Sequence, residues 1–182
     1  MKSKTEIKAR RLSRKKIYRG YCFDVFLDRV VWPNGQTLDR DLLVHRHDIS
    51  VMVPVLDRSR LILIRQYRYG AEKYLWEIPA GTIGPKESAL ACAKRELVEE
   101  IGYAAKRWKK LAAVYASPGF NTELIHCFAA EGLVQKKIAH ESDEIIQARV
   151  FTRAQVKAMI RSREIQDAKT LLALFYFFGG AA

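Results

Sequence analysis

Cysteine is scarce in this chain, and its few copies lie far apart. Cys22, Cys92 and Cys127 are odd in number, and no two of them have the short spacing of a zinc site. Such a set supports neither a disulfide framework nor a cysteine-based metal centre. We therefore expect the thiols to be reduced and to serve packing.

Long apolar runs are also missing. The longest run near an end, residues 171–178, is far shorter than the roughly 20 residues that a membrane-spanning helix needs. No apolar stretch follows the charged N-terminus, as a secretory signal would require. Because 49% of the 182 residues are apolar, the chain is able to bury a core. We expect a soluble cytoplasmic protein with no membrane partner.

Acidic residues are fewer than basic ones, and the formal charge is +12. Residues 1–20 hold most of this excess, with nine Lys or Arg against the single acid Glu6, so the remaining chain is only mildly basic. A segment of this kind is a solvated tail, a contact to phosphates or an arm between two copies of the chain. The composition leaves all three open.

The spacing of apolar residues predicts an α+β chain with a mixed sheet. Alternation over 21–32, a turn at 33–35 and a second run over 38–45 predict an N-terminal β-hairpin. Further strands are predicted over 51–56, 61–64, 74–79, 111–115, 124–129 and 148–151. Helices are predicted over 88–101 with Gly102 at the end, over 153–160 behind Thr152 as N-cap, and near 167–177. We divide the chain into a basic segment with its hairpin, residues 1–48, and a main domain, residues 49–182.

A cluster of glutamates on the helix predicted over 88–101 carries the chemistry. Glu96 and Glu100 are four residues apart and Glu99 follows Glu96 by three, so the carboxylates share one helix face. Like charges at this spacing repel one another and weaken a helix unless cations occupy the face. Carboxylate oxygens suit Mg²⁺, Mn²⁺ or Ca²⁺, and Mg²⁺ commonly bridges carboxylates and phosphate oxygens. The cluster points to a phosphate ester or anhydride as substrate.

The segment GTIGPKESALACAKRELVEEIGY, residues 81–103, resembles the Nudix box. In that pattern a glycine, a glutamate and the run REUxEExGU stand at fixed spacings, where U is a bulky apolar residue. The matching residues are Gly81, Glu87, Arg95, Glu96, Leu97, Glu99, Glu100 and Gly102. Tyr103 departs from the usual aliphatic residue at a position that serves packing. The resemblance covers roughly residues 20–160 and implies the Nudix fold, a mixed sheet between helices.

Two flanking stretches narrow the resemblance to one branch of Nudix hydrolases. LILIRQYRYGAEKYLWEIPAG before the box and SPGFNTELIHCF after it are similar to pyrophosphatases of ADP-ribose and nucleoside diphosphate sugars. Pro118 lies 16 residues after Gly102, close to the spacing in that branch. The implied activity is metal-dependent hydrolysis of a pyrophosphate into a nucleoside monophosphate and a sugar phosphate. Gly84 stands where several ADP-ribose enzymes carry an acid, which leaves other nucleoside diphosphate sugars open.

The resemblance also assigns a metal site. Mg²⁺, with Mn²⁺ as a substitute, would be held by Glu96, Glu99, the catalytic Glu100 and the backbone carbonyl of Ala80. Glu87 and Arg95 are expected to form an ion pair that supports these ligands rather than to touch the substrate.

Other roles implied by the resemblance lie outside the box. In the acidic run 140–144, Glu144 or Glu141 would be a ligand or catalytic base, with an acidic surface turn as the alternative. Arg40 and Arg68 match positions where this branch directs arginine toward substrate phosphate or ribose, a task that suits a bidentate guanidinium. A surface salt bridge explains either arginine equally well.

Two other functions remain open at this stage. The basic N-terminus would suit a pyrophosphohydrolase of RNA 5′ ends or dinucleoside polyphosphates, although we do not favour nucleic acid as a partner. A catalytically silent nucleotide-binding module is less consistent, because this chain keeps every box carboxylate. We expect a homodimer joined through the N-terminal hairpin.

Overall fold

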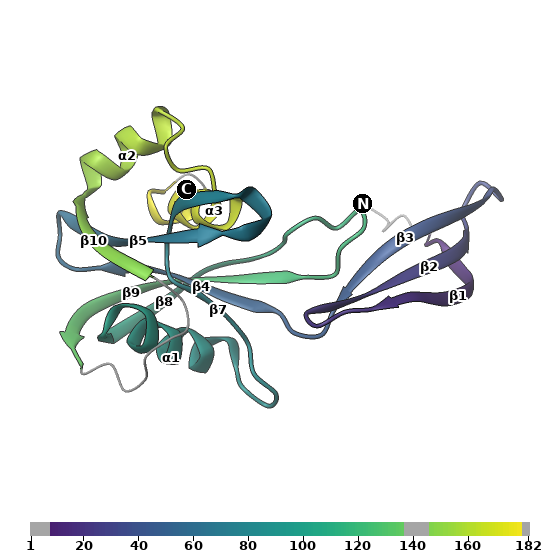
Figure 1. The fold of residues 1–182 in the computed structure, drawn as a ribbon, viewed down its shortest axis with the longest axis horizontal. Helices are drawn as coiled ribbons and strands as arrows, with labels where there is room; N and C mark the ends of the chain where they lie inside the picture. The colour runs from purple at the N-terminus through teal and green to yellow at the C-terminus, as the bar shows by residue number, and fades with distance from the viewer. Residues whose placement is uncertain (1–7, 137–145, 180–182) are drawn as a thin grey trace, which may run out of the picture. The chain divides into compact units, whose positions relative to one another are not determined.

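The computed structural model describes residues 8–136 and 146–179. The chain forms two compact units, each with its own sheet. The first unit contains the residues up to His47 together with Tyr115–Glu123, and the second contains Asp48–Val114 together with the residues from Leu124 onward. Figure 1 follows the chain through both sheets.

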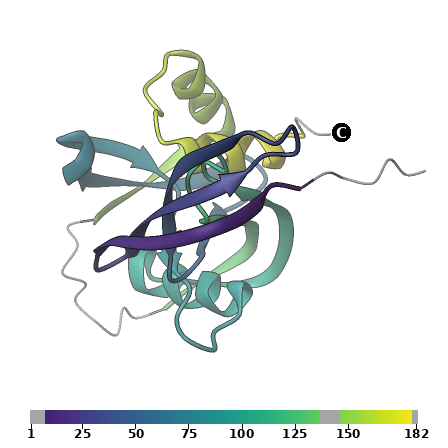
Figure 2. The same ribbon diagram turned by 90° about the vertical axis from the view of Figure 1, so that its right-hand side faces the viewer.

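The first unit is built on three antiparallel strands, which lie side by side in Figure 2. They are β1 (Arg10–Arg19), β2 (Phe23–Val31) and β3 (Thr37–His45). The β2–β3 pair confirms the predicted hairpin. Strand β1 was not predicted, because seven of its ten residues are Arg, Lys or Ser and hide any apolar alternation; every residue of the strand is exposed.

Ion pairs with β2 balance part of the charge on β1. The Nε and Nη2 atoms of Arg14 each donate to a carboxylate oxygen of Asp28 at 2.7 Å, and Lys16 donates to Asp24 at 2.7 Å. Both cations also lie over the ring of Phe26. The guanidinium beside Asp28 lowers the pKa of that carboxyl, against a smaller opposing effect of burial. These contacts explain why so basic a segment forms a strand.

The second unit holds a mixed seven-stranded sheet in the order β10-β5-β4-β9-β8, with β6 paired to β5 and β7 paired to β4. Strands β4 and β9 are parallel, whereas β5, β6, β7 and β10 join by antiparallel pairing. The strands are β4 (Ile49–Val55), β5 (Arg60–Arg68), β6 (Lys73–Glu77), β7 (Ala80–Thr82), β8 (Tyr103–Tyr115), β9 (Leu124–Gln135) and β10 (Ile146–Thr152). A short 3₁₀ turn, η1 (Tyr69–Ala71), joins β5 to β6.

Helices cover both faces of this sheet, as the resemblance implied (Figure 1). They are α1 (Ala89–Ile101), α2 (Arg153–Arg161) and α3 (Ala168–Phe177). Alternate residues of β4 point to opposite faces: Val51 and Val53 pack with α2 and α3, whereas Met52 packs with α1. The two apolar clusters thus confirm the expected arrangement of a mixed sheet between helices.

The predicted helix ends are also confirmed. The Ser88 hydroxyl accepts a hydrogen bond from the Ala91 amide at the start of α1, and Gly102 ends that helix at a φ of 70°. Thr152 forms a capping box with Gln155 at the start of α2. None of the helices among the described residues is both long enough and apolar enough to cross a bilayer.

Strand β8 is longer than predicted. The apolar pattern placed it at 111–115, but it begins at Tyr103. Its first eight residues include four basic ones, which obscure the apolar alternation there: Lys106, Arg107, Lys109 and Lys110.

The three cysteines differ in burial, and we expect them to differ in reactivity for that reason. Cys22 is exposed, whereas Cys92 and Cys127 are buried, and burial raises the pKa of each buried thiol to about 11. Thiol reagents attack the thiolate, so at pH 8 we expect only Cys22 to react quickly in the folded protein. Ellman's reagent would measure this stoichiometry before and after unfolding in denaturant. The Cys22→Ser variant should lose the fast reaction, and rapid labelling of Cys92 or Cys127 in the folded protein would contradict the buried assignment.

Candidate functional site

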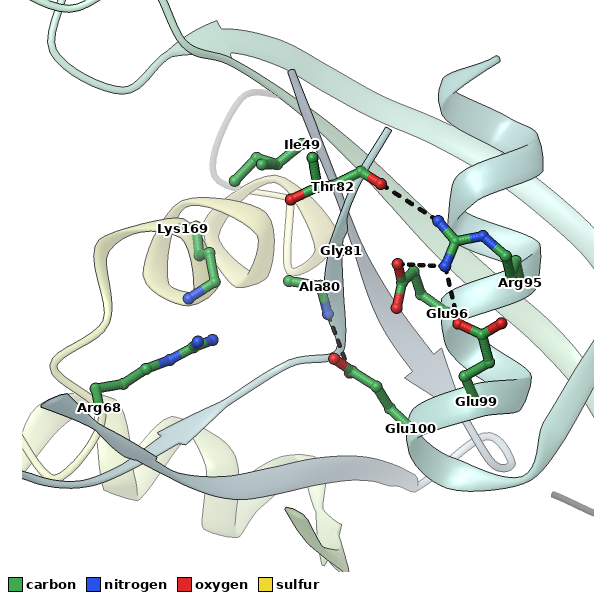
Figure 3. A pocket seen from close by; sticks show the side chains of 10 residues that line it. All are labelled: Ile49, Arg68, Ala80, Gly81, Thr82, Arg95, Glu96, Glu99, Glu100 and Lys169. Atoms are coloured by element: carbon green, nitrogen blue, oxygen red, sulfur yellow. Dashed lines mark hydrogen bonds and ion pairs between the residues drawn. The ribbon is translucent and has the colours of Figure 1, made fainter. Parts of the chain in front are cut away.

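A pocket of about 570 Å³ lies within the second unit (Figure 3). Its wall comes from β4, β5, β7, α1 and α3. In the view of Figure 3, the glutamates of α1 lie on one side of β7, while Arg68 and Lys169 lie on the other. The lining residues are Ile49, Arg68, Ala80, Gly81, Thr82, Arg95, Glu96, Glu99, Glu100 and Lys169.

Helix α1 approaches β7 closely at Gly81. A Cβ atom on Gly81 would lie 1.9 Å from both the Cδ and Oε1 atoms of Glu96, which is far inside any real contact. The glycine therefore leaves the space that the Glu96 carboxylate occupies beside the strand. Next to this contact, the backbone N–H of Ala80 donates to Oε2 of Glu100 at 3.2 Å. Two of the three clustered carboxylates are thus held against β7.

Arg95 connects the carboxylates of the helix with the loop before it. Its Nη1 atom donates to Glu96 at 2.6 Å and to Glu99 at 2.8 Å. Its Nε and Nη2 atoms each donate to Glu87 at 3.1 Å, and Nη2 also donates to the Thr82 carbonyl at 3.3 Å. Hydrogen bonding to Glu87 is the largest of the effects that raise the pKa of Arg95, and Arg95 in turn lowers the pKa of Glu87. The guanidinium therefore stays charged and offsets the repulsion among the glutamates.

The donor chemistry of this wall fits a hard divalent cation. Glu96, Glu99 and Glu100 all line the pocket beside Ala80, and carboxylate and carbonyl oxygens are the ligands that Mg²⁺ prefers. As the side chains stand, no three His, Cys, Asp or Glu residues within the described ranges converge on one point. Glu96 and Glu99 would have to turn partly away from Arg95 to share an ion.

The two cations of the opposite wall bind a buried carboxylate that we did not predict. The Glu77 side chain is 0% exposed, and both its oxygens accept from Arg68 at 2.8 Å. Lys169 donates to Oε2 of Glu77 and, at 2.8 Å, to Asp167. Burial raises the pKa of Glu77, but the hydrogen bonds and charges of Arg68 and Lys169 together outweigh it and lower the pKa. A sequence signal was present, because Glu77 stands between the apolar residues Trp76 and Ile78, and a buried charge needs partners.

Arg40, Glu141 and Glu144 are the predicted residues that remain. Arg40 belongs to β3 in the first unit, where its guanidinium lies over the ring of Trp32 at 5.4 Å. Glu141 and Glu144 fall outside the described residues. The assignment of a base to either acid, and of Arg40 to substrate, therefore stays a prediction.

Comparison with known proteins identifies the class. The NUDIX domain family model matches residues 46–174, and the chain belongs to this family.

Particular relatives resemble three quarters of the chain or more. It is 35% identical over 167 residues to an ADP-ribose pyrophosphatase of Bacillus subtilis (strain 168), covering 91% of this chain and 90% of the relative. It is 33% identical over 152 residues to a GDP-mannose pyrophosphatase of Citrobacter koseri, covering 75% of this chain and 79% of the relative. A crystal structure described as an ADP compounds hydrolase matches with a TM-score of 0.87 and 25% identity, covering 97% of this chain and 95% of that one.

The close approach at Gly81 is open to a direct test. In Gly81→Ala the added Cβ would displace Glu96, so we expect the affinity for Mn²⁺ to fall by roughly tenfold or more, the range seen when ligand geometry is disturbed. Gly70→Ala is the matched control, because its Cβ would meet no atom within 4 Å. Titration of Mn²⁺ followed by electron paramagnetic resonance would measure the affinities. Equal affinity in both variants would mean that Glu96 is not needed as a ligand.

Proposed function

We propose that this chain hydrolyses the pyrophosphate of ADP-ribose or a related nucleoside diphosphate sugar, giving a nucleoside monophosphate and a sugar phosphate. One observation carries the proposal: three glutamates on α1 and two cations, Arg68 and Lys169, line a single pocket. A pyrophosphate bound with divalent metal needs both kinds of group, because the carboxylates hold the metal and the cations meet the remaining phosphate charge. The ADP-ribose and GDP-mannose pyrophosphatases among the relatives support this substrate class.

Each wall of the pocket then has its own task. Glu96, Glu99, Glu100 and the carbonyl of Ala80 would hold Mg²⁺ or Mn²⁺. When bound, such ions neutralise charge on the anhydride oxygens and lower the pKa of the attacking water. The other residues named for the reaction are Arg68 and Arg40 for the substrate, Glu144 or Glu141 as base, and the Glu87–Arg95 pair, which fixes the orientation of the α1 carboxylates.

We further propose that two copies of the chain associate through residues 1–48, and that residues 49–182 form the hydrolase domain. Strand β1 lies at the edge of its sheet, so one side of its backbone is available to pair with another strand. The free thiols fit a reducing compartment, which supports a cytoplasmic location.

A substrate panel tests the activity. Phosphate released after phosphatase treatment would be measured for ADP-ribose, ADP-glucose, GDP-mannose, UDP-glucose, diadenosine polyphosphates and RNA with a 5′ triphosphate. We expect preferential turnover of ADP-ribose or another nucleoside diphosphate sugar, its loss in EDTA, and its return on adding Mg²⁺ or Mn²⁺. Turnover of RNA or polyphosphates alone would contradict the proposed substrate and favour a role for the exposed basic strand β1.

The metal-holding role of α1 predicts a large kinetic effect. In Glu100→Gln the side chain keeps its size but loses the charge that a divalent ion requires, so we expect kcat to fall on the order of a hundredfold or more, equivalent to about 3 kcal/mol. The matched control is Glu131→Gln on β9, which removes the ion pair of an exposed carboxylate with Arg107 of β8. Steady-state turnover and the melting temperature would be measured for both. A Glu100→Gln enzyme with near-normal kcat would exclude the proposed metal ligand.

A further inference from the structure

One buried carboxylate joins three elements of the second unit. Glu77 ends strand β6, Arg68 ends strand β5, and Lys169 lies in the first turn of α3. The backbone N–H of Ile78 also donates to the Thr170 hydroxyl at 3.0 Å, which ties the same strand to the same helix. The positions of both pocket cations thus depend on contacts around Glu77.

The contacts at Glu77 restrict how the cations are oriented. Arg68 binds both carboxylate oxygens through Nε and Nη2, a fork geometry that fixes the plane of the guanidinium. Lys169 is held between Glu77 and Asp167, and its side chain is only 15% exposed. A lysine on a flexible stem loses much of its freedom when two acceptors share its ammonium group.

Charge repulsion makes the carboxylate necessary in this position. Arg68 and Lys169 bind the same oxygen of Glu77, so their positive groups lie close together and would repel each other without it. A fully buried carboxylate is itself costly unless it is paired and hydrogen-bonded, and here the two cations provide that pairing. Glu77 therefore makes a close pair of cations compatible with the folded state.

We propose that Glu77 is a positioning residue that holds Arg68 and Lys169 together so that both face the pyrophosphate of the substrate. This role rests on the proposed function, because the cations are assigned to the phosphates of the same pocket. Glu77 acts through its partners, since it is fully buried and does not line the pocket.

The test compares Glu77→Gln with the control Glu131→Gln by calorimetric titration of inorganic pyrophosphate in the presence of Mg²⁺. We expect Glu77→Gln to bind pyrophosphate roughly tenfold more weakly, as when one well-aligned charged hydrogen bond is lost, while the control stays near the wild type. For the best substrate of the panel, KM should rise by a similar factor.

A purely structural role gives a different result. It would lower the melting temperature and the active fraction, but the remaining folded enzyme would keep its KM and its pyrophosphate affinity. Unchanged or tighter pyrophosphate binding in Glu77→Gln would therefore overturn the proposal, because Glu77 would then only screen the charge of the cations.

A second variant covers the case in which Glu77→Gln fails to fold. Glu77→Asp keeps the charge but shortens the side chain by one CH₂ group, so it no longer reaches both cations. We expect weaker pyrophosphate binding here too, and wild-type affinity would overturn the proposal. Failure of the proposed function can be told apart from failure of this inference. If the wild-type protein binds pyrophosphate but hydrolyses no nucleoside diphosphate sugar, the proposed function is wrong, but the effect of Glu77 on pyrophosphate affinity is still measurable.

Discussion

Three carboxylates share one face of helix α1, and their mutual repulsion is the constraint around which the pocket is arranged. Groups of the protein itself balance part of this charge. Arg95 donates to Glu96 and Glu99, while the Ala80 amide donates to Glu100. The Ala80–Glu100 bond, together with the bond from Arg95 to the Thr82 carbonyl, holds the helix beside β7. The groups that balance the charge therefore also shape the pocket.

On the opposite wall the repulsion is between positive charges, because two cations are held close together. Arg68 and Lys169 are 9 and 92 residues away from Glu77 along the chain, and the buried carboxylate brings them to one place. The pocket therefore has two walls of opposite charge, each stabilised by a group of the other sign. An anion carrying divalent metal fits between such walls, because the metal meets the glutamates and the anion meets the cations.

How much of this arrangement the sequence predicts depends on how local each interaction is. The caps at Ser88, Gly102 and Thr152 are formed by residues within a few positions, and the sequence located those helix ends correctly. The glutamate face of α1 follows from helical spacing alone, and its three carboxylates line one pocket. Glu77 and Lys169 were missed because the partners that explain a buried charge come from β5 and α3, and nothing in the local pattern reveals that pairing.

In strand β1, too, the sequence did not reveal which charged residues pair with each other. Net charge left a solvated tail, a phosphate contact and an arm between two copies open. In the structure, Arg14 and Lys16 pair with Asp28 and Asp24 on the neighbouring strand. These acids lie 14 and 8 residues away, and counting charges along the chain cannot show that the two sets face each other. Because Arg14 and Lys16 are held by these acids, the count of nine basic residues in 1–20 overstates how many are available to an anionic partner. The case for phosphate chemistry rests instead on the pocket of the second unit, where opposite charges converge.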